Sequence, residues 1–113
     1  MARIEWKTLQ SSQDLTDALE ESMHKTVLIF KHSTRCSVSF MAKKGLETQW
    51  EYSSDDIQSY YLDLIAFRDL SNEISSKLGV DHESPQVILL QNGFVVDHQS
   101  HGEIQTGSFR QFL

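Results

Sequence analysis

Short apolar runs that alternate with amphipathic segments constrain this chain more than any other feature. Val27-Leu28-Ile29-Phe30 and Val87-Ile88-Leu89-Leu90 are continuous runs of the kind found in strands buried on both faces of a sheet. A further strand is predicted over residues 57–67. Between these runs the apolar residues recur at helical spacing. Because helical crossovers join parallel strands, the alternation predicts an α/β fold with parallel pairing.

The other elements follow from the same periodicities. Asn92-Gly93, between residues 87–90 and 94–96, predicts a hairpin that adds one antiparallel strand at an end of the sheet. Ser11 and Asp14 predict a helix start, and Gly79 a helix end. The remaining predictions are a strand or extended entry over residues 4–9 and helices over residues 15–23, 36–50, 69–78 and 106–113. The positions that fit the helical period are Leu15, Ala18, Leu19, Ser22 and Met23 in the first helix and Val38, Met41, Ala42, Leu46 and Trp50 in the second. The predicted order is β-α-β-α-β-α-β-β-α.

Length and charge narrow the class of protein. The 113 residues suffice for one domain, predicted to span residues 1–113, and no apolar run is long enough to cross a membrane. Ten basic against sixteen acidic residues give a net charge of −6, which disfavours a nucleic-acid partner. The first residues lack the apolar region of a secretory signal, and a single cysteine cannot form an internal disulfide. We therefore expect a cytoplasmic protein without a membrane partner.

The one cysteine, Cys36, falls where the chemistry of such a sheet is expected. It follows the strand of residues 27–30 and precedes a helix, so it lies at the carboxyl end of a strand, where α/β sheets bind ligands. The N-terminus of a helix stabilises a thiolate, and the neighbouring Arg35 and His32 are expected to add positive charge. The alternative is that Cys36 is a small buried hydrophobic residue, as most free cysteines are. The local context favours a nucleophile.

Ser39 follows Cys36 by one helical turn, at the position where a dithiol protein has its second cysteine. A thiolate attacks a disulfide through a mixed disulfide, and here no second thiol exists to resolve it. Ser39 is expected either to donate a hydrogen bond to the Cys36 sulfur or simply to leave room for the adduct. The sequence therefore predicts that Cys36 can accept a thiol group from a mixed disulfide (the passenger thiol) and that the protein cannot release this group without an external thiol.

The second half of the chain carries a set of motifs: a proline, an apolar strand, an Asn-Gly turn, a glycine and a short terminal helix. Its residues are Pro85-Gln86-Val87-Ile88-Leu89-Leu90-Gln91-Asn92-Gly93, His101-Gly102 and Phe109-Arg110-Gln111-Phe112-Leu113. This set resembles that of thioredoxins at matching spacing, and the resemblance to the thioredoxin-like superfamily covers essentially the whole chain. Within the superfamily the details resemble the monothiol bacilliredoxin family, in Lys31-His32-Ser33-Thr34, Cys36-x-x-Ser39, His82-Glu83-Ser84-Pro85-Gln86 and Ser100-His101. One departure is that Arg35 and Ser37 flank Cys36 where the family has threonine and proline.

The resemblance implies a thioredoxin-like fold, with a central mixed sheet flanked by helices, and a cis Ser84–Pro85 bond that faces Cys36. It implies that Cys36 is catalytic, that Thr34, Arg35, Ser37 and Ser39 form the active-site loop, and that Ser84, Pro85 and His101 contact substrate. It further implies a stress-response oxidoreductase that removes a low-molecular-weight thiol, bacillithiol, from client proteins carrying mixed disulfides. Bacillithiol would be a co-substrate, with no bound cofactor. Thioredoxins bury a carboxylate on the strand before the cysteine, and residues 27–30 have none.

Other classes of function compete with this interpretation. A thioredoxin-like module could bind clients without catalysis, with Cys36 passive. An iron–sulfur carrier of the monothiol glutaredoxin kind would have Cys-Gly-Phe-Ser where this chain has Cys-Ser-Val-Ser. His98 and His101 alone do not make a metal site, which usually needs four ligands, so no metal is predicted. The chain is also too small for a papain-like protease.

Overall fold

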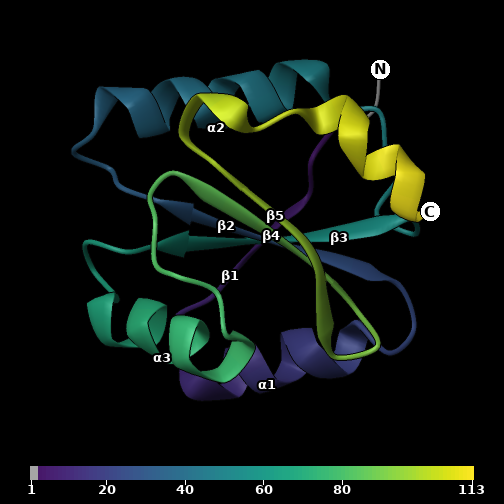
Figure 1. Ribbon diagram of the computed structural model, residues 1–113, viewed down its shortest axis with the longest axis horizontal. Coiled ribbons are helices and arrows are strands. Elements are labelled where there is room, and N and C mark those ends of the chain that lie inside the picture. The colour runs from purple at the N-terminus through teal and green to yellow at the C-terminus, as the bar shows by residue number, and fades with distance from the viewer. Residues whose placement is uncertain (1–2) are drawn as a thin grey trace.

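A five-stranded sheet separates two layers of helices in the computed structural model, which describes residues 3–113 (Figure 1). Helices α1 and α3 cover one face, and α2 with the C-terminal segment covers the other. Of the predicted domain, residues 1–2 lie outside the described part. The elements are β1 (Trp6–Thr8), α1 (Ser12–Glu21), β2 (Thr26–His32), α2 (Ser37–Gln49), β3 (Ile57–Asp63), α3 (Arg68–Leu78), β4 (Gln86–Gln91), β5 (Phe94–Ser100) and the 3₁₀ segments η1 (His101–Glu103) and η2 (Thr106–Phe112).

The sheet is mixed, as predicted, with strand order β1-β3-β2-β4-β5. Strands β1, β3 and β2 are parallel, whereas β4 is antiparallel to β2 and β5 is antiparallel to β4. The alternation of helices and strands predicted that only the hairpin strand would be antiparallel, and this was wrong for β4. Antiparallel pairing of Lys31 with Gln86 puts the start of β4 beside the end of β2. Pro85 consequently lies at the same edge of the sheet as the loop that leads to Cys36.

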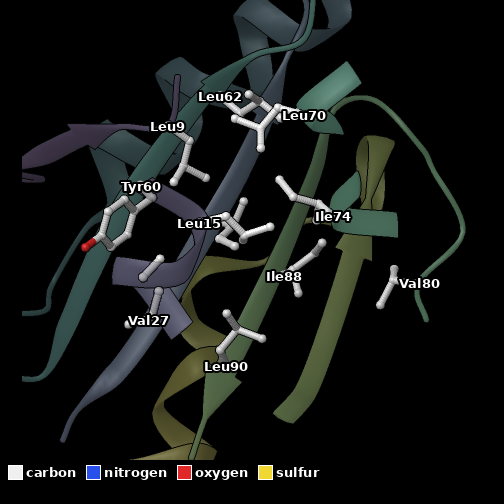
Figure 2. Close-up of a cluster of buried hydrophobic side chains, with 12 residues drawn as sticks. Leu9, Leu15, Val27, Tyr60, Leu62, Leu70, Ile74, Val80, Ile88 and Leu90 are labelled. Atoms are coloured by element: carbon white, nitrogen blue, oxygen red, sulfur yellow. The ribbon is translucent and has the colours of Figure 1, made fainter. Parts of the chain in front are cut away.

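Two hydrophobic cores pack against opposite faces of the central strand β2, all seven residues of which are buried. Val27 and Ile29 face α1 and α3, where they pack with Leu15, Ile74 and Ile88 (Figure 2). The alternate residues of the strand face α2, because successive side chains point to opposite faces. This second core contains Leu28, Phe30, Leu46, Trp50, Tyr52 and Phe109. The prediction that residues 27–30 are buried on both faces is confirmed.

Local chemistry sets several element boundaries. Ser11 caps α1 by accepting a hydrogen bond from the Asp14 backbone, as predicted, and α3 ends at Gly79 with φ +68°. The predicted strand over residues 57–67 ends early, at Asp63, because its carboxylate accepts hydrogen bonds from the backbone of Ile65 and Ala66 and forms a turn. The predicted terminal helix is a 3₁₀ segment.

Three apolar side chains at these helical positions are exposed. Met23 lies beyond the end of α1, and Val38 and Met41 lie on the outer surface of α2 with exposed fractions of 54% and 62%. Helical spacing alone therefore does not identify the buried residues, since the residues of α2 that pack inward include Ser39 and Leu46. Among residues 3–113, no helix has the length and apolar character needed to cross a membrane.

Replacing Phe109 by alanine tests how the C-terminal segment is held. Its ring is fully buried and contacts Trp50 and Tyr52 at centroid distances of 6.3 and 6.2 Å. Removing it leaves a cavity, so Phe109→Ala is expected to lower the free energy of unfolding by about 3–5 kcal/mol in urea titrations. Phe94→Ala is the matched control, because that ring is 75% exposed, and it should change stability by no more than ~0.5 kcal/mol. Equal effects of the two variants would contradict this packing.

Candidate active site

Cys36 is the N-cap residue of α2 and is half-buried. Its backbone N–H donates to the carbonyl of Ser33 at 3.2 Å, and its own carbonyl accepts from the N–H of Phe40 at 3.0 Å. The side chain makes no capping hydrogen bond. The first N–H groups of a helix have no intrahelical partners and mark the positive end of its dipole. Cys36 therefore lies at the positive end of the dipole of the 13-residue helix α2.

The residues around Cys36 form an exposed loop in a basic part of the chain. Thr34, Arg35 and Ser37, three of the predicted loop residues, are exposed. Residues 22–46 contain no Asp or Glu and five Lys or Arg, although the whole chain has a net charge of −6. This local imbalance is visible in the sequence and was missed there. Within this range Arg35 directly precedes Cys36, whereas Lys31 is buried against α3 on the other face of the sheet.

Ser39 does not hydrogen-bond to Cys36 within the part of the chain that the structure describes. Its side chain is fully buried, accepts a hydrogen bond from the backbone N–H of Ser33 at 3.0 Å and pairs with Nδ1 of His32 at 2.7 Å. The expected hydrogen bond from Ser39 to the sulfur is therefore wrong, because the hydroxyl is committed to the base of the loop. The pair couples the end of β2 to the first turn of α2 and so positions the loop that carries Cys36.

His32 does not add positive charge to the site, contrary to expectation. The imidazole is 5% exposed and lies against Phe30 and Tyr61, with ring centroids 5.7 and 5.5 Å away. Burial, assisted by the nearby Lys43 ammonium, lowers the pKa of His32 below its ordinary value of 6.5. At neutral pH the ring is therefore uncharged, and its part in the site is to hold Ser39.

The Ser84–Pro85 peptide bond is cis, as the resemblance implied. The register of β2 and β4 puts Pro85 just beyond the Lys31–Gln86 pair, beside His32. The carbonyl of Pro85 accepts a hydrogen bond from the N–H of His101 at 2.9 Å, and His101 turns there with φ +55°. The hydroxyl of Ser84 is buried and has no hydrogen-bond partner among the described residues. The structure thus brings Ser84, Pro85 and His101 to the edge of the sheet where the Cys36 loop begins.

A pocket of about 410 Å³ opens between the outer face of α2 and the turn at His101. Its walls are mainly apolar, and it adjoins the residue that follows Cys36. The walls include Ser37, Val38 and Met41 from α2 and His101 and Ile104 from the turn. The exposed side chains of Val38 and Met41 therefore line this pocket.

Lys31 is a buried charged residue that the sequence pattern did not predict to be buried. It is fully buried at the end of β2, where its ammonium group contacts α3 and His82. Strand alternation places Lys31 on the same face as Val27 and Ile29, and this was the available signal. Residues 27–30 of this strand carry no charge, and the buried charge at its end is the Lys31 ammonium. In residues 3–113, no three His, Cys, Asp or Glu side chains converge to form a metal site.

Comparisons with known proteins agree with this geometry. A solved structure of a proposed oxidoreductase with a thioredoxin fold is 34% identical, with a TM-score of 0.76 over 94% of this chain and 91% of that one. Thioredoxins from Malassezia sympodialis and Halobacterium salinarum (the latter a point mutant) show the same fold at 16% and 20% identity. Their TM-scores are 0.72 and 0.70, covering 99% and 96% of this chain and 90% and 87% of those chains.

The family model described as "Monothiol bacilliredoxin BrxC" matches residues 7–109, which include every residue of the site described above. This match and the thioredoxin fold support a thiol oxidoreductase-like role. The chain belongs to the monothiol bacilliredoxin family.

Proposed function

We propose that this protein is a single-cysteine thiol–disulfide oxidoreductase that removes a low-molecular-weight thiol, bacillithiol, from mixed disulfides on client proteins. The observation that carries the proposal is the pairing of one half-buried cysteine at the start of α2 with a serine, not a thiol, one turn later. Family membership supports the choice of bacillithiol. We further propose that residues 1–113 act as one domain in the cytoplasm, where disulfides are rare and thiols stay reduced.

In the first step the Cys36 thiolate attacks the passenger sulfur of a client mixed disulfide. A Cys36–S–S–R bond forms, the client S–S bond breaks, and the electron pair leaves on the client cysteine as a thiolate. The N–H groups at the start of α2 and the neighbouring Arg35 favour negative charge on the attacking sulfur. We propose that the backbone of Ser84 pairs with the bound disulfide segment and that the pocket bounded by Val38 and His101 receives the group beside it.

The second step needs a thiol from outside the chain. A second small thiolate, or a thiolate of a partner protein, attacks the passenger sulfur of Cys36–S–S–R, and Cys36 leaves as the thiolate. Ser39 cannot take this part, because an alcohol does not form a disulfide and its hydroxyl is already bonded to His32 and Ser33. The protein therefore cycles between a free and an S-thiolated form, with no internal disulfide.

Mass spectrometry of the intact protein tests the transfer. When it is mixed with a client protein that carries bacillithiol on a cysteine, wild type is expected to gain one bacillithiol while the client loses it. Cys36→Ser should gain none and leave the client modified, because the nucleophile is gone. Ser76→Ala, which removes an exposed hydroxyl on α3, is the control that keeps full transfer. Tight binding of the client without any transfer by wild type would instead favour a non-catalytic binding module.

Placing a thiol in the resolving position tests the single-cysteine step. In Ser39→Cys the introduced thiol lies one helical turn from Cys36, so it should expel the passenger and close an internal disulfide. The S-thiolated form is then expected to decay within the experiment, whereas in wild type it persists until a thiol is added. Ser39→Ala removes the same hydroxyl without adding a thiol, and its adduct should persist. Spontaneous release of the passenger by wild type or Ser39→Ala would contradict the mechanism.

A further inference from the structure

The ammonium group of Lys31 is enclosed at the end of β2 without a carboxylate partner among the described residues. The side chain has no exposed surface. Its Nζ donates to the backbone carbonyl of Ser71 and to the hydroxyl of Ser75, both at 3.1 Å, and lies 3.4 Å from Nδ1 of His82. Even a hydrogen-bonded buried charge is often no more stabilising than an apolar side chain of similar size, so stability alone does not account for a lysine in this place.

The contacts of Lys31 reach the loop that precedes β4. Nδ1 of His82 also pairs with the hydroxyl of Ser71 at 3.1 Å, so one ring nitrogen of the loop meets both β2 and α3. Gln86, which stands opposite Lys31 in the sheet, donates from its side chain to the carbonyl of Asp81 at 3.0 Å. These contacts tie both the start and the end of residues 81–86 to the strand that leads to Cys36.

The same loop is fastened on its other side to the end of β5. The hydroxyl of Ser100 donates to the Glu83 carboxylate, and the N–H of His101 donates to the carbonyl of Pro85. Ser84 and Pro85 are therefore held between two sets of bonds. The contacts of Lys31 fix the position of Ser84 and Pro85 relative to β2. Because β2 leads to Cys36, they also fix that position relative to the nucleophile.

We propose that Lys31 is a positioning residue for thiol–disulfide exchange, whose ammonium group holds His82 and thereby sets Ser84 and Pro85 at the correct distance from Cys36. This inference rests on the proposed function, because it assigns Ser84 and Pro85 the task of holding the substrate disulfide. Small displacements of such a positioning segment are costly, because the attacking and attacked sulfurs must be aligned.

The charges of the cluster agree with this arrangement at neutral pH. Burial lowers the pKa of Lys31 from 10.5 to about 8, so the group is mostly an ammonium at pH 7. Burial, Lys31 and Arg68 of α3 lower the pKa of His82, whereas Glu83 of the loop raises it, and the net direction is down. His82 is therefore mainly neutral at pH 7, and in the tautomer with its proton on Nε2 the Nδ1 atom accepts from the Lys31 ammonium as well as from the Ser71 hydroxyl.

The pH dependence of stability tests whether the Lys31 amine is enclosed in the folded protein, because enclosure lowers its pKa. Between pH 8 and pH 10.5 the unfolded chain holds more protons on Lys31 than the folded chain does, since its pKa is about 8 when folded and 10.5 when exposed. The free energy of unfolding of wild type should therefore rise with pH in this window relative to Lys31→Met. Parallel curves for the two proteins would mean that the pKa of Lys31 is the same in the folded and unfolded chains, so its amine would not be enclosed against α3 and His82, and the proposal would be overturned.

Transfer kinetics test the positioning itself, with wild type, Lys31→Met, His82→Ala and the exposed control Lys77→Met. With a bacillithiol-modified client, kcat/KM should fall on the order of 10- to 100-fold in Lys31→Met and His82→Ala, and no further in the double variant. Alkylation of Cys36 by iodoacetamide, which needs no disulfide alignment, should keep its wild-type rate in every variant. His82→Ala, at an exposed residue, keeps the test available if Lys31→Met does not fold.

The outcomes separate this inference from the proposed function. If wild type transfers bacillithiol and Lys31→Met and His82→Ala have the same kcat/KM, the role of Lys31 is overturned. The proposed function is then unaffected. Slower alkylation in step with slower transfer also overturns positioning, since Lys31 would then act on the reactivity of the thiol itself. Wild type that transfers no bacillithiol overturns the function and this inference together.

Discussion

The antiparallel pairing of β4 with the central strand β2 is the constraint on which the rest of this structure depends. Because Lys31 pairs with Gln86, the start of β4 meets the end of β2, and Pro85 comes to lie at the edge where the Cys36 loop begins. Parallel pairing of the same two strands would send Pro85 to the opposite edge of the sheet, about six residues away, or roughly 20 Å at the rise of an extended strand. The candidate site exists only with the observed direction of β4.

The last two residues of β2 then connect this edge to both helical layers. Successive residues of a strand point to opposite faces. Lys31 accordingly reaches α3 and the loop before β4, while His32 reaches the first turn of α2 through Ser39. Both are buried polar groups with satisfied hydrogen bonds, placed where the rest of β2 is a hydrophobic core. Polar networks of this kind favour one arrangement of the elements they join, since unpaired groups are costly in a dry interior.

A serine in the resolving position changes more than the number of thiols. In a dithiol protein the second cysteine must stay available to the first, whereas the Ser39 hydroxyl is bonded to His32 and Ser33 at the base of the loop. The position that holds the second thiol in a dithiol protein is thus used here to shape the loop that carries Cys36. The neutral His32 fits this role, because a protonated imidazole would be a second cation beside Lys43 in a buried setting.

The sequence by itself determined the order of the elements, the central buried strand, the hairpin at Asn92-Gly93 and the place of Cys36 before a helix. These follow from local periodicity, turn chemistry and a single cysteine, and the resemblance to thioredoxin-like proteins added Ser84–Pro85. Only the tertiary structure decided the direction of β4, the commitment of Ser39 to His32, the burial of Lys31 against His82 and the exposure of Val38 and Met41. Each of these depends on contacts between residues far apart in the chain, and the periodicity of a segment carries no information about its distant neighbours.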